Sequence, residues 1–377
     1  MRPTPVLHVI DTGGPGGAET VYLDLLCGLH RDRWEPIAVV PERDWLWEAL
    51  ENRGIEPVLL RGTRSFDFAY LSRLRSLARS RRVALLQTHL LGSAVYGAAV
   101  GRLLRIPQVS TFHGTVDISA SDRHLRAKLW ILDRASTRLV FVSQSLQRHF
   151  ETISGHGPAA ARVIHNGIDL ETFRPGSEPE LRADFGVGQE EILLGAIGNV
   201  RPAKDYPTLL RALAELAKRG IHPRCIIVGQ PSGSLGGDLL ALRAALGLEK
   251  TVEFIGFRSD IDRVLQALDA LVISSSSEGF SLTAVQALAT GTPVVSTRCG
   301  GPEEILEHDV TGVLVPAGSP SALADGIERI CSDRALRARL SSGGRRVAES
   351  RFSLHMMIEG YERLYHELSE GRRGARA

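Results

Sequence analysis

Short apolar runs alternate with segments of helical periodicity along both halves of the chain. Runs of this kind occupy residues 6–10, 36–40, 57–60, 83–87, 108–111 and 139–142, and again residues 192–197, 224–228, 252–255, 270–273, 293–296 and 312–315. Such runs predict strands, and the intervening segments, with apolar residues three or four apart, predict helices. Repeated strand–helix units are typical of parallel sheets covered on both faces. The pattern therefore predicts an α/β fold with one sheet in each half.

The two halves are separated by a stretch with turn and linker composition. Residues 163–169 read Val-Ile-His-Asn-Gly-Ile-Asp, in which Asn-Gly is a turn signal, and residues 176–184 are mainly polar. We place the boundary near residue 175. This predicts a first domain over residues 1–175 and a second domain over residues 176–352.

A glycine-rich loop follows the first predicted strand. Residues 11–19 read Asp-Thr-Gly-Gly-Pro-Gly-Gly-Ala-Glu, and Gly16 and Gly17 stand at the start of the next helix. Glycines let the backbone approach a ligand closely and a helix start attracts an anion, although a tightly packed turn has the same composition. The dinucleotide fingerprint needs a third glycine where Glu19 stands, so a nicotinamide cofactor is not expected.

Two histidines lie at or just beyond the predicted ends of strands in the first half. His89 ends the sequence Gln-Thr-His, and His113 lies in Thr-Phe-His-Gly. Ligands of open α/β sheets bind beyond the carboxyl ends of the strands, so both histidines are candidates for a binding site. A lone histidine is more often structural, and we favour that interpretation for His89.

A second strand–loop–helix occupies residues 270–290. The strand ends in a serine cluster, and Ser281 is expected to be the N-cap of the helix that follows. The backbone N–H groups of Leu282 and Thr283 would then point into the loop that contains Glu278 and Gly279. Such a helix start suits a diphosphate.

These motifs resemble those of family 4 glycosyltransferases, retaining enzymes of the GT-B fold that use nucleotide-sugar donors. The resemblance rests on Glu-Gly-Phe at 278–280, on Ala-x-Ala-x-Gly-x-Pro-Val-Val at 287–295 and on Gly-Gly-Ala-Glu at 16–19. It continues in His-Gly at 113–114, in Asn-Gly-Ile-Asp at 166–169 with Phe-x-Pro at 173–175, and in a terminal helix. It implies two Rossmann-like domains facing across a cleft, with residues 353–377 returning to complete the first, acceptor-side domain.

The resemblance also implies roles for individual residues. Lys204 would reach the donor diphosphate, Glu278 the donor sugar, and His113 the sugar or the acceptor side. The remaining donor-binding candidates are Gly16, Gly17, Asn199, Arg201, Phe257, Gly279, Phe280, Ser281, Leu282 and Gln286.

Two of these positions depart from the family pattern. Asn199 stands where the family has an arginine, for which Arg201 is a candidate substitute, and Gln286 stands where it has a second glutamate that binds ribose. A glutamine still accepts hydrogen bonds but lacks the charge of a carboxylate. The departures affect the expected donor affinity more than the expected reaction type.

Composition narrows the classes of partner and compartment. Charged residues make up 23% of the chain and the formal net charge is +2, so no nucleic-acid partner is expected. The four cysteines are scattered, which favours reduced thiols and a cytoplasmic location, and the sequence shows neither a signal peptide nor a membrane-spanning run. Asp260 and Asp262 lack further acidic ligands, so we expect no metal site.

Arginine is concentrated in one region of the first half. It occurs at residues 61, 64, 73, 75, 79, 81 and 82, and a basic helix with an apolar side covers residues 123–130. An ordinary solvated face explains these charges, and so does contact with an anionic membrane surface, such as the inner face of the cell membrane.

The sequence therefore predicts a retaining, metal-independent glycosyltransferase without a cofactor. Its acceptor is expected to be a glycan, a lipid-linked compound or a small molecule, in the synthesis of cell-surface polysaccharide or glycolipid. Two alternatives stay open: a degenerate family member that binds nucleotide or regulates a partner, and a nucleotide-sugar epimerase of the same fold.

Overall fold

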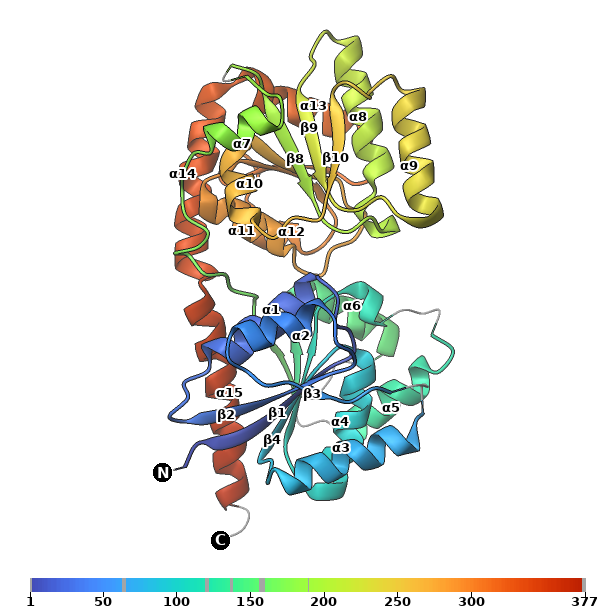
Figure 1. Ribbon diagram of the computed structural model, residues 1–377, viewed down its shortest axis with the longest axis vertical. Helices are drawn as coiled ribbons and strands as arrows, with labels where there is room; N and C mark the ends of the chain where they lie inside the picture. The colour runs from blue at the N-terminus through green and yellow to red at the C-terminus, as the bar shows by residue number, and fades with distance from the viewer. Residues whose placement is uncertain are drawn as a thin grey trace. The chain divides into compact units, whose positions relative to one another are not determined.

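The computed structural model describes residues 2–62, 66–118, 122–135, 138–155, 160–188 and 190–374. It divides into two compact units (Figure 1). Unit 1 comprises Met1–Gly167 together with Leu354–Ala377, and unit 2 comprises Ile168–Ser353. Each unit contains one parallel sheet with helices packed against it.

Unit 1 is built on a seven-stranded parallel sheet in the order β3-β2-β1-β4-β5-β6-β7. Its strands are β1 (Thr4–Ile10), β2 (Trp34–Val40), β3 (Val58–Leu59), β4 (Leu85–His89), β5 (Gln108–Phe112), β6 (Arg138–Phe141) and β7 (Ala161–Val163). Its helices are α1 (Gly17–Gly28), α2 (Trp45–Asn52), α3 (Phe68–Ser80), α4 (Leu91–Leu104), the 3₁₀ helix η1 (Thr115–Ile118), α5 (Leu125–Ala135), α6 (Gln144–Ser154) and α15 (Leu354–Gly374).

Alternation along the strands of unit 1 supplies two cores, one on each face of the sheet. Leu7 and Val9 of β1 pack with residues of α3 and α4, including Tyr70 and Val100. Ile10 packs on the other face with residues of α1 and α2. Because successive side chains of a strand point to opposite faces, a sheet covered on both sides needs apolar residues at most positions of its strands.

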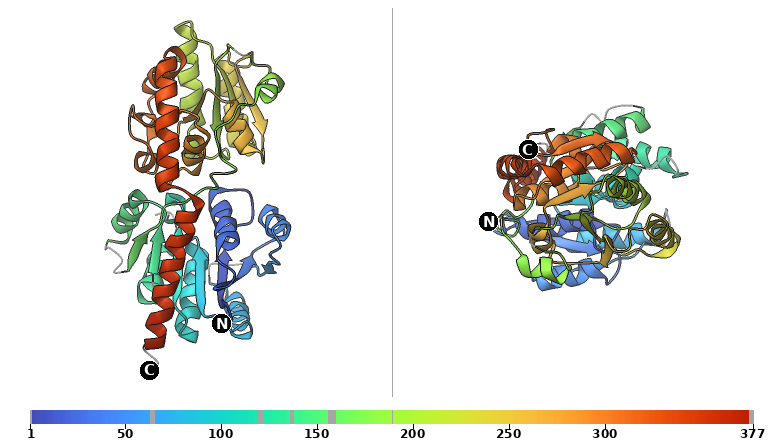
Figure 2. Two further views of the ribbon diagram at one scale, coloured as in Figure 1. Left: turned by 90° about the vertical axis from the view of Figure 1, so that its left-hand side faces the viewer. Right: turned by 90° about the horizontal axis from the view of Figure 1, so that it is seen from above.

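The long helix α15 packs beside α1 in unit 1, although it lies at the other end of the chain (Figure 2). Gly28 of α1 makes this contact close, because a Cβ there would lie 2.7 Å from Ile358. Glu362 of α15 accepts a 2.9 Å hydrogen bond from the backbone N–H of His30. Tyr361 and Tyr365 of the same helix are fully buried, so α15 forms part of the core of unit 1.

Unit 2 is built on a six-stranded parallel sheet in the order β10-β9-β8-β11-β12-β13. Its strands are β8 (Leu193–Ile197), β9 (Arg224–Val228), β10 (Val252–Gly256), β11 (Ala270–Ile273), β12 (Val294–Arg298) and β13 (Val313–Pro316). Its helices are α7 (Pro179–Asp184), η2 (Pro202–Lys204), α8 (Tyr206–Lys218), α9 (Gly233–Ala245), α10 (Ile261–Ala267), α11 (Leu282–Thr290), α12 (Pro302–Ile305), α13 (Pro320–Ser332) and α14 (Arg334–Arg351).

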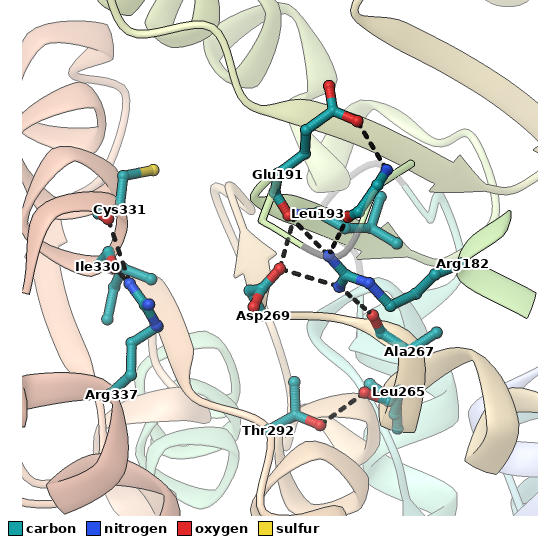
Figure 3. A network of polar contacts seen from close by, with 11 residues as sticks. Arg182, Glu191, Leu193, Leu265, Ala267, Asp269, Thr292, Ile330, Cys331 and Arg337 are labelled. Atoms are coloured by element: carbon teal, nitrogen blue, oxygen red, sulfur yellow. Dashed lines mark hydrogen bonds and ion pairs between the residues drawn. The ribbon is translucent and has the colours of Figure 1, made fainter. Parts of the chain in front are cut away.

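A polar network fixes the amino ends of β8 and β11, the two central strands of unit 2 (Figure 3). The guanidinium of Arg182 donates to the carbonyl of Ala267 at 2.8 Å and to the carboxylate of Asp269 at 3.0 Å. Asp269 also accepts the backbone N–H of Leu193 at 2.8 Å. These charge-assisted bonds join α7 to both strands and so hold the strands that support the candidate site.

The structure confirms the α/β fold and the twelve strands expected from the apolar runs, with small shifts at their ends. The strand expected at residues 83–87 is β4 at Leu85–His89, so His89 belongs to the strand itself. One strand was missed: β7, at Ala161–Val163, lies at the edge of the sheet and is too short to show a pattern. Arg64 of the predicted basic region lies outside the described residues.

Candidate active site

The order of strands locates the main candidate site in unit 2. From β8 the chain proceeds to β9 and β10 on one side, and from β11 to β12 and β13 on the other. The neighbouring strands β8 and β11 therefore mark the point at which the winding of the sheet reverses. The loops that follow such strands diverge and leave a crevice in which ligands of α/β sheets bind.

The two loops at this point carry an ion pair. Lys204 ends η2, which follows β8, and Glu278 lies in the loop after β11. The ammonium Nζ of Lys204 donates to Glu278 Oε1 at 2.7 Å, and the two side chains are 24% and 14% exposed. The predicted diphosphate-binding and sugar-binding residues are thus brought into direct contact.

A serine cluster supports both members of the pair, and the sequence did not single out its members for this role. Ser275 Oγ donates to Glu278 Oε1 at 2.7 Å, and Ser274 Oγ donates to the backbone carbonyl of Lys204 at 2.8 Å. The N–H of Ser276 bonds to the carbonyl of Ala203 at 2.8 Å. Four consecutive serines after a buried strand were the available signal, and the hydroxyl of Ser274 and the N–H of Ser276 join the two loops.

The Glu278 loop is also fastened to the turn after β12. The N–H of Glu278 donates to the carbonyl of Cys299 at 3.1 Å, and the carbonyl of Glu278 accepts from the N–H of Gly301 at 3.0 Å. A Cβ on Gly301 would lie 2.6 Å from the Cα of Phe280, so only glycine fits there. Burial raises the pKa of the neighbouring Cys299 thiol to about 12, which keeps it uncharged.

Helix α11 begins directly after this loop, as expected, but its cap differs from the prediction. Ser281 is the N-cap residue, yet its side chain makes no capping hydrogen bond, so the prediction of a serine side-chain cap is wrong. The hydroxyl lies instead 3.4 Å from that of Thr283. The side chain of Ser281 therefore does not cap the amino end of α11, and Leu282 is the first residue of the helix.

The other predicted donor-binding residues of this loop and helix are largely buried. Gly279 is buried behind Glu278, and the ring of Phe280 is 3% exposed and packs edge-on against Phe352 at 5.6 Å between centroids. Gln286 lies one turn into α11 and is 9% exposed. Phe280 therefore supports the loop from beneath through its side chain.

Three further candidates lie in more open loops of unit 2. Asn199 and Arg201 are exposed between β8 and η2, and Arg201 is the residue that precedes η2. Gly198, with φ of 150°, lets this loop pass Lys204 closely, because a Cβ there would lie 2.7 Å from Lys204 Cε. Phe257, in the loop after β10, is 55% exposed, which excludes the alternative that it is a core residue.

In unit 1, Gly16 and Gly17 lie at the start of α1, as predicted. A Cβ on Gly16 would lie 2.4 Å from the carboxylate of Glu19, whereas Gly17 has open space around it. Glu19, which breaks the dinucleotide fingerprint, is buried against Gly16. Gly16 therefore lies in close contact with the carboxylate of Glu19, and Gly17 is the more accessible of the two.

A pocket of about 470 Å³ lies at the carboxyl ends of β1 and β4 in unit 1, where the winding of that sheet reverses. Its polar lining comes from Asp11, Tyr70, Tyr96 and Lys128, and its apolar lining includes Ile10 and Val95. Asp11 Oδ2 accepts the backbone N–H of Ser93 at 2.8 Å, at the start of α4. Asp11, directly after β1, was the sequence feature that indicated this pocket. The interpretation of this loop rested instead on the glycines that follow Asp11.

His113 lies just beyond β5, and it contacts His89 at the end of β4. His89 Nδ1 and His113 Nε2 are 2.9 Å apart. Burial lowers the pKa of His113 to about 3, and burial followed by the charges of His113 and His8 lowers the pKa of His89 well below its usual value. Both imidazoles are therefore neutral at physiological pH. His89 is fully buried, in keeping with the structural role favoured for it.

Among the residues of the described ranges, no three His, Cys, Asp or Glu side chains are grouped so that they could hold a metal ion. None of the helices, as far as they are described, is both long and apolar enough to cross a membrane.

Comparisons with known proteins match both units. The family model "Glycosyltransferase Family 4" matches residues 15–172, and the model "Glycosyl transferases group 1" matches residues 177–347. The D-inositol 3-phosphate glycosyltransferase of Corynebacterium jeikeium is 31% identical over 317 residues, which are 78% of this chain and 74% of that protein. The protein of the same name from Saccharomonospora viridis is 35% identical over 226 residues, 58% of this chain, and the match spans about half (52%) of that relative's length.

A solved structure agrees over almost the whole chain. HepE of Anabaena, in complex with UDP and glucose, is 25% identical, with a TM-score of 0.87 over 97% of this chain and 99% of HepE. The same protein in complex with UDP-glucose gives a TM-score of 0.86 at 25% identity, over 96% of this chain.

Proposed function

Because this chain belongs to glycosyltransferase family 4, with the GT-B fold, we propose that it transfers a sugar from a nucleotide-diphosphate sugar to a hydroxyl acceptor with retention of anomeric configuration. The observation that carries this proposal is the 2.7 Å contact between Lys204 Nζ and Glu278 Oε1, at the strand ends where the sheet of unit 2 reverses. A cation and a carboxylate at this place suit a ligand that has both a phosphate and sugar hydroxyls.

The leaving diphosphate gains negative charge as the glycosidic bond to the nucleotide breaks. The ammonium of Lys204 and the free N–H groups at the start of α11 supply preorganised positive charge for it, without a metal ion or cofactor. Glu278 accepts hydrogen bonds from hydroxyls of the transferred sugar. An oxygen of the leaving phosphate takes the acceptor proton on the same face of the sugar, so no dedicated protein base is required and the configuration is retained.

The nucleotide is held by less charge than is usual in the family. Gln286 binds the ribose through a neutral amide, the loop of Phe257 contacts the base, and the exposed Arg201 contacts phosphate in place of the arginine that Asn199 replaces. The relatives of known structure support a uridine nucleotide as the first donor to test, since HepE was crystallised with UDP-glucose.

The pocket at Asp11 in unit 1 is the proposed acceptor site. A carboxylate, two phenols and an ammonium beside apolar side chains suit a polyol, which presents hydroxyls on its edge and C–H groups on its faces. A glycan, a lipid-linked sugar or a small polyol fits this description, in the synthesis of cell-surface polysaccharide or glycolipid. The relatives named D-inositol 3-phosphate glycosyltransferase make that phosphate one acceptor to test.

The test is an assay of the purified chain with UDP-glucose and other nucleotide sugars against a set of acceptors, with and without EDTA. We expect nucleoside diphosphate and an α-linked product from an α-linked donor, identified by the NMR coupling of the anomeric proton. Turnover should persist in EDTA. An inverted product would overturn the retaining assignment, and a requirement for Mg²⁺ or Mn²⁺ would overturn the role given to Lys204.

Asn199 and Gln286 favour a second candidate, a family member that binds nucleotide without transferring sugar. Thermal-shift titration separates the two, because stabilisation by nucleotides without turnover on any acceptor supports the binding protein. An epimerase of the same fold would consume the nucleotide sugar without an acceptor, so the acceptor-free reaction is included.

A further inference from the structure

The side-chain amide of Gln87 in β4 lies at the centre of a buried hydrogen-bond network in unit 1. Gln87 Oε1 accepts from the hydroxyl of Tyr365 on α15 at 3.0 Å. Gln87 Nε2 donates to Thr111 Oγ1 at 2.9 Å and to the carbonyl oxygen of Thr88 at 3.3 Å. A carbonyl oxygen only accepts, so the nitrogen of the amide must face Thr88, and the orientation of the amide is fixed.

The same amide nitrogen lies 3.3 Å from Nε2 of His89. An amide nitrogen has two protons and no available lone pair, so it can only donate, and the proton not used by Thr111 is shared between the Thr88 carbonyl and His89 Nε2. His89 Nε2 must therefore be the unprotonated nitrogen that accepts. A neutral imidazole has a single ring proton, which therefore lies on Nδ1 of His89. The neutral state follows from the lowered pKa of His89, whose main cause is burial.

The proton on His89 Nδ1 in turn determines the tautomer of His113. His89 Nδ1 lies 2.9 Å from His113 Nε2, and the two rings are inclined by only 13° with centroids 5.1 Å apart. A centroid separation so much larger than the N···N distance places the rings edge to edge in nearly one plane, as a linear N–H···N bond requires. His113 Nε2 therefore accepts, and the proton of neutral His113 lies on Nδ1.

His113 Nδ1 is buried and has no hydrogen-bond partner among the described residues. A buried N–H without an acceptor is unfavourable until an acceptor reaches it. The Nδ1–H group is therefore the donor with which His113 can bind a ligand.

We propose that Tyr365, Gln87 and His89 act in series as positioning residues that hold His113 in its Nδ1–H tautomer, so that His113 meets the substrate as a hydrogen-bond donor and not as a base. The ligand atom is an oxygen of the bound sugar. That identification rests on the proposed function, whereas the tautomer rests only on contacts within unit 1.

Heteronuclear NMR of the full chain with ¹⁵N-labelled histidine tests the relay directly, because two-bond ¹H–¹⁵N correlations distinguish the protonated ring nitrogen from the bare one. His113→Gln and His89→Gln assign the signals. In the wild-type protein at neutral pH we expect Nδ1–H for both histidines. An Nε2–H tautomer of His113 would overturn the proposal without the need of any further variant.

Gln87→Glu tests whether the amide of Gln87 sets these tautomers, because a carboxylate accepts a hydrogen bond where the amide donates one. His89 should then place its proton on Nε2, toward the new carboxylate, and His113 should donate from Nε2 to His89 Nδ1. Both tautomers reverse, and His113 Nδ1 becomes an acceptor. Unchanged tautomers in a folded Gln87→Glu protein would show that Gln87 does not set them.

Gln108→Glu is the matched control. Gln108 is also a buried amide of the same sheet, and its Nε2 donates to Thr88 Oγ1, Ser110 Oγ and the carbonyl of Ala94. The same change of chemistry there should leave both histidine tautomers as in the wild type. Reversal in this control as well would mean that added buried charge, and not the contact with His89, moves the protons, which would overturn the relay.

Kinetics provide a second readout. Gln87→Glu should lower kcat by up to about ten-fold, the factor associated with one hydrogen bond, while the Kd for nucleoside diphosphate changes by less than about two-fold, since the Lys204 site lies in unit 2. A wild-type chain with the expected tautomers but no transferase activity would count against the proposed function and leave the relay supported. Equal loss of kcat in Gln87→Glu and Gln108→Glu would contradict the positioning role.

Discussion

At the scale of single residues, Lys204 is the cation that contacts Glu278 in the candidate site. Ser275 is a second donor to the same carboxylate oxygen. Glu278 would therefore keep one hydrogen bond if Lys204 were removed, whereas a bound diphosphate would lose the only lysine in its loop. Replacing Lys204 therefore tests its role in catalysis while Glu278 keeps a hydrogen bond that supports the fold.

We predict that Lys204→Ala lowers the rate of transfer by about 10²–10³-fold, the effect of removing one donor that stabilises charge in a transition state. The fold should survive because η2 is a surface turn and the carboxylate keeps Ser275. The measurements are kcat with saturating donor and a circular dichroism spectrum. Lys218→Ala, an exposed lysine in the last turn of α8, is the control and should retain full activity. Equal turnover of wild type and Lys204→Ala would contradict the assignment.

Gln286 offers a prediction in which affinity and stability move in opposite directions. If it binds ribose, Gln286→Glu replaces neutral hydrogen bonds by charged ones, a gain of about 1–2 kcal/mol or roughly five- to thirty-fold in Kd. The same charge is unfavourable in the ligand-free protein, because the side chain is 9% exposed, so the free variant should unfold more easily. Calorimetric titration with UDP, GDP and ADP and a thermal melt measure both.

Gln286→Met serves as the companion variant, since it keeps the size of the side chain and removes its hydrogen bonds. It should bind each nucleotide more weakly than the wild type. If neither substitution changes the affinity for any nucleotide, residue 286 does not face the ribose. Weaker binding by Gln286→Glu would instead mean that the charge meets another acid or an unusual donor.

Single residues were predictable from sequence where a motif fixes them, and unpredictable where only the tertiary fold brings them together. Lys204 and Glu278 were identified separately, but their contact joins loops after two strands that are neighbours only in the folded sheet. The contact of Gln87, His89 and Tyr365 was likewise invisible, because α15 lies at the far end of the chain. The roles of the predicted site residues stay predictions.

At the scale of elements, apolar runs located the strands because both faces of each sheet are covered. A strand buried on both sides is mainly apolar, and that is a signal a single sequence carries, although β4 and β5 also bury polar side chains such as Gln87, His89 and Gln108. The signal fails for β7, three residues at the sheet edge, whereas α11 begins at Leu282 as expected and lacks only a side-chain cap from Ser281. The boundary near residue 175 stays a prediction as well.

The close approach of two turns gives a prediction about the elements. Gly301→Ala places a Cβ 2.6 Å from the Cα of Phe280 and 2.7 Å from its nitrogen, so backbone and not a mobile side chain must move. We expect a loss of about 1–3 kcal/mol in the free energy of unfolding, as for overpacked sites, and weaker binding of donor as Glu278 shifts. Chemical denaturation and nucleotide titration measure the two effects.

The control for this substitution is Gly237→Ala in α9. A Cβ at Gly237 meets nothing within 4 Å, and the position lies inside a helix, so the substitution should stabilise the protein by up to about 1 kcal/mol. Unaltered donor binding in Gly301→Ala would show that the Glu278 loop tolerates the displacement, against the arrangement described above.

At the scale of the whole molecule, acid is expected to destabilise unit 1 through its buried histidines. His8 of β1 is fully buried, and burial, with a smaller contribution from Arg31, lowers its pKa to about 3; the pKa of His89 is lowered as well. Above about pH 6.5 neither folded nor unfolded histidine is charged and the effect is absent. Below it the unfolded chain binds the protons first, so unit 1 loses about 1.4 kcal/mol per pH unit for each such histidine, and for His8 the loss continues down to about pH 3.

Tryptophan fluorescence reports this loss in unit 1 alone, since all four tryptophans, at 34, 45, 47 and 130, belong to it. The midpoint of urea unfolding seen by fluorescence should fall between pH 7 and pH 5. His8→Met should flatten the dependence, because it removes one titrating group, and substitution of the exposed His222 in unit 2 should leave it unchanged. A midpoint independent of pH would contradict the assignment of buried neutral histidines.

The charge of the whole molecule is small, but unit 1 concentrates basic and aromatic side chains on its α3–α4–α5 layer. Arg73, Arg75 and Arg79 are exposed on α3, beside Phe68, which is 82% exposed. On α5, Trp130 is 59% exposed and lies under the guanidinium of Arg134 at 4.7 Å from the ring centroid. Phe66 and His124, in contact at 5.4 Å, join the starts of the two helices. Cations interspersed with exposed aromatic rings are typical of surfaces that bind anionic lipid headgroups and insert at their interface.

We therefore predict that the protein sediments with vesicles containing phosphatidylglycerol and not with phosphatidylcholine vesicles, and that salt releases it. Each basic residue near such a surface contributes about 1 kcal/mol, and the attraction falls off within a Debye length of about 8 Å at physiological salt. Replacing Arg73, Arg75 and Arg79 by glutamine should therefore weaken vesicle binding by about two orders of magnitude. The same change of charge at the exposed Arg211, Lys218 and Arg334 of unit 2 should have little effect. Equal sedimentation with both lipids, or equal loss in both triple variants, would leave an ordinary solvated face and favour a water-soluble acceptor.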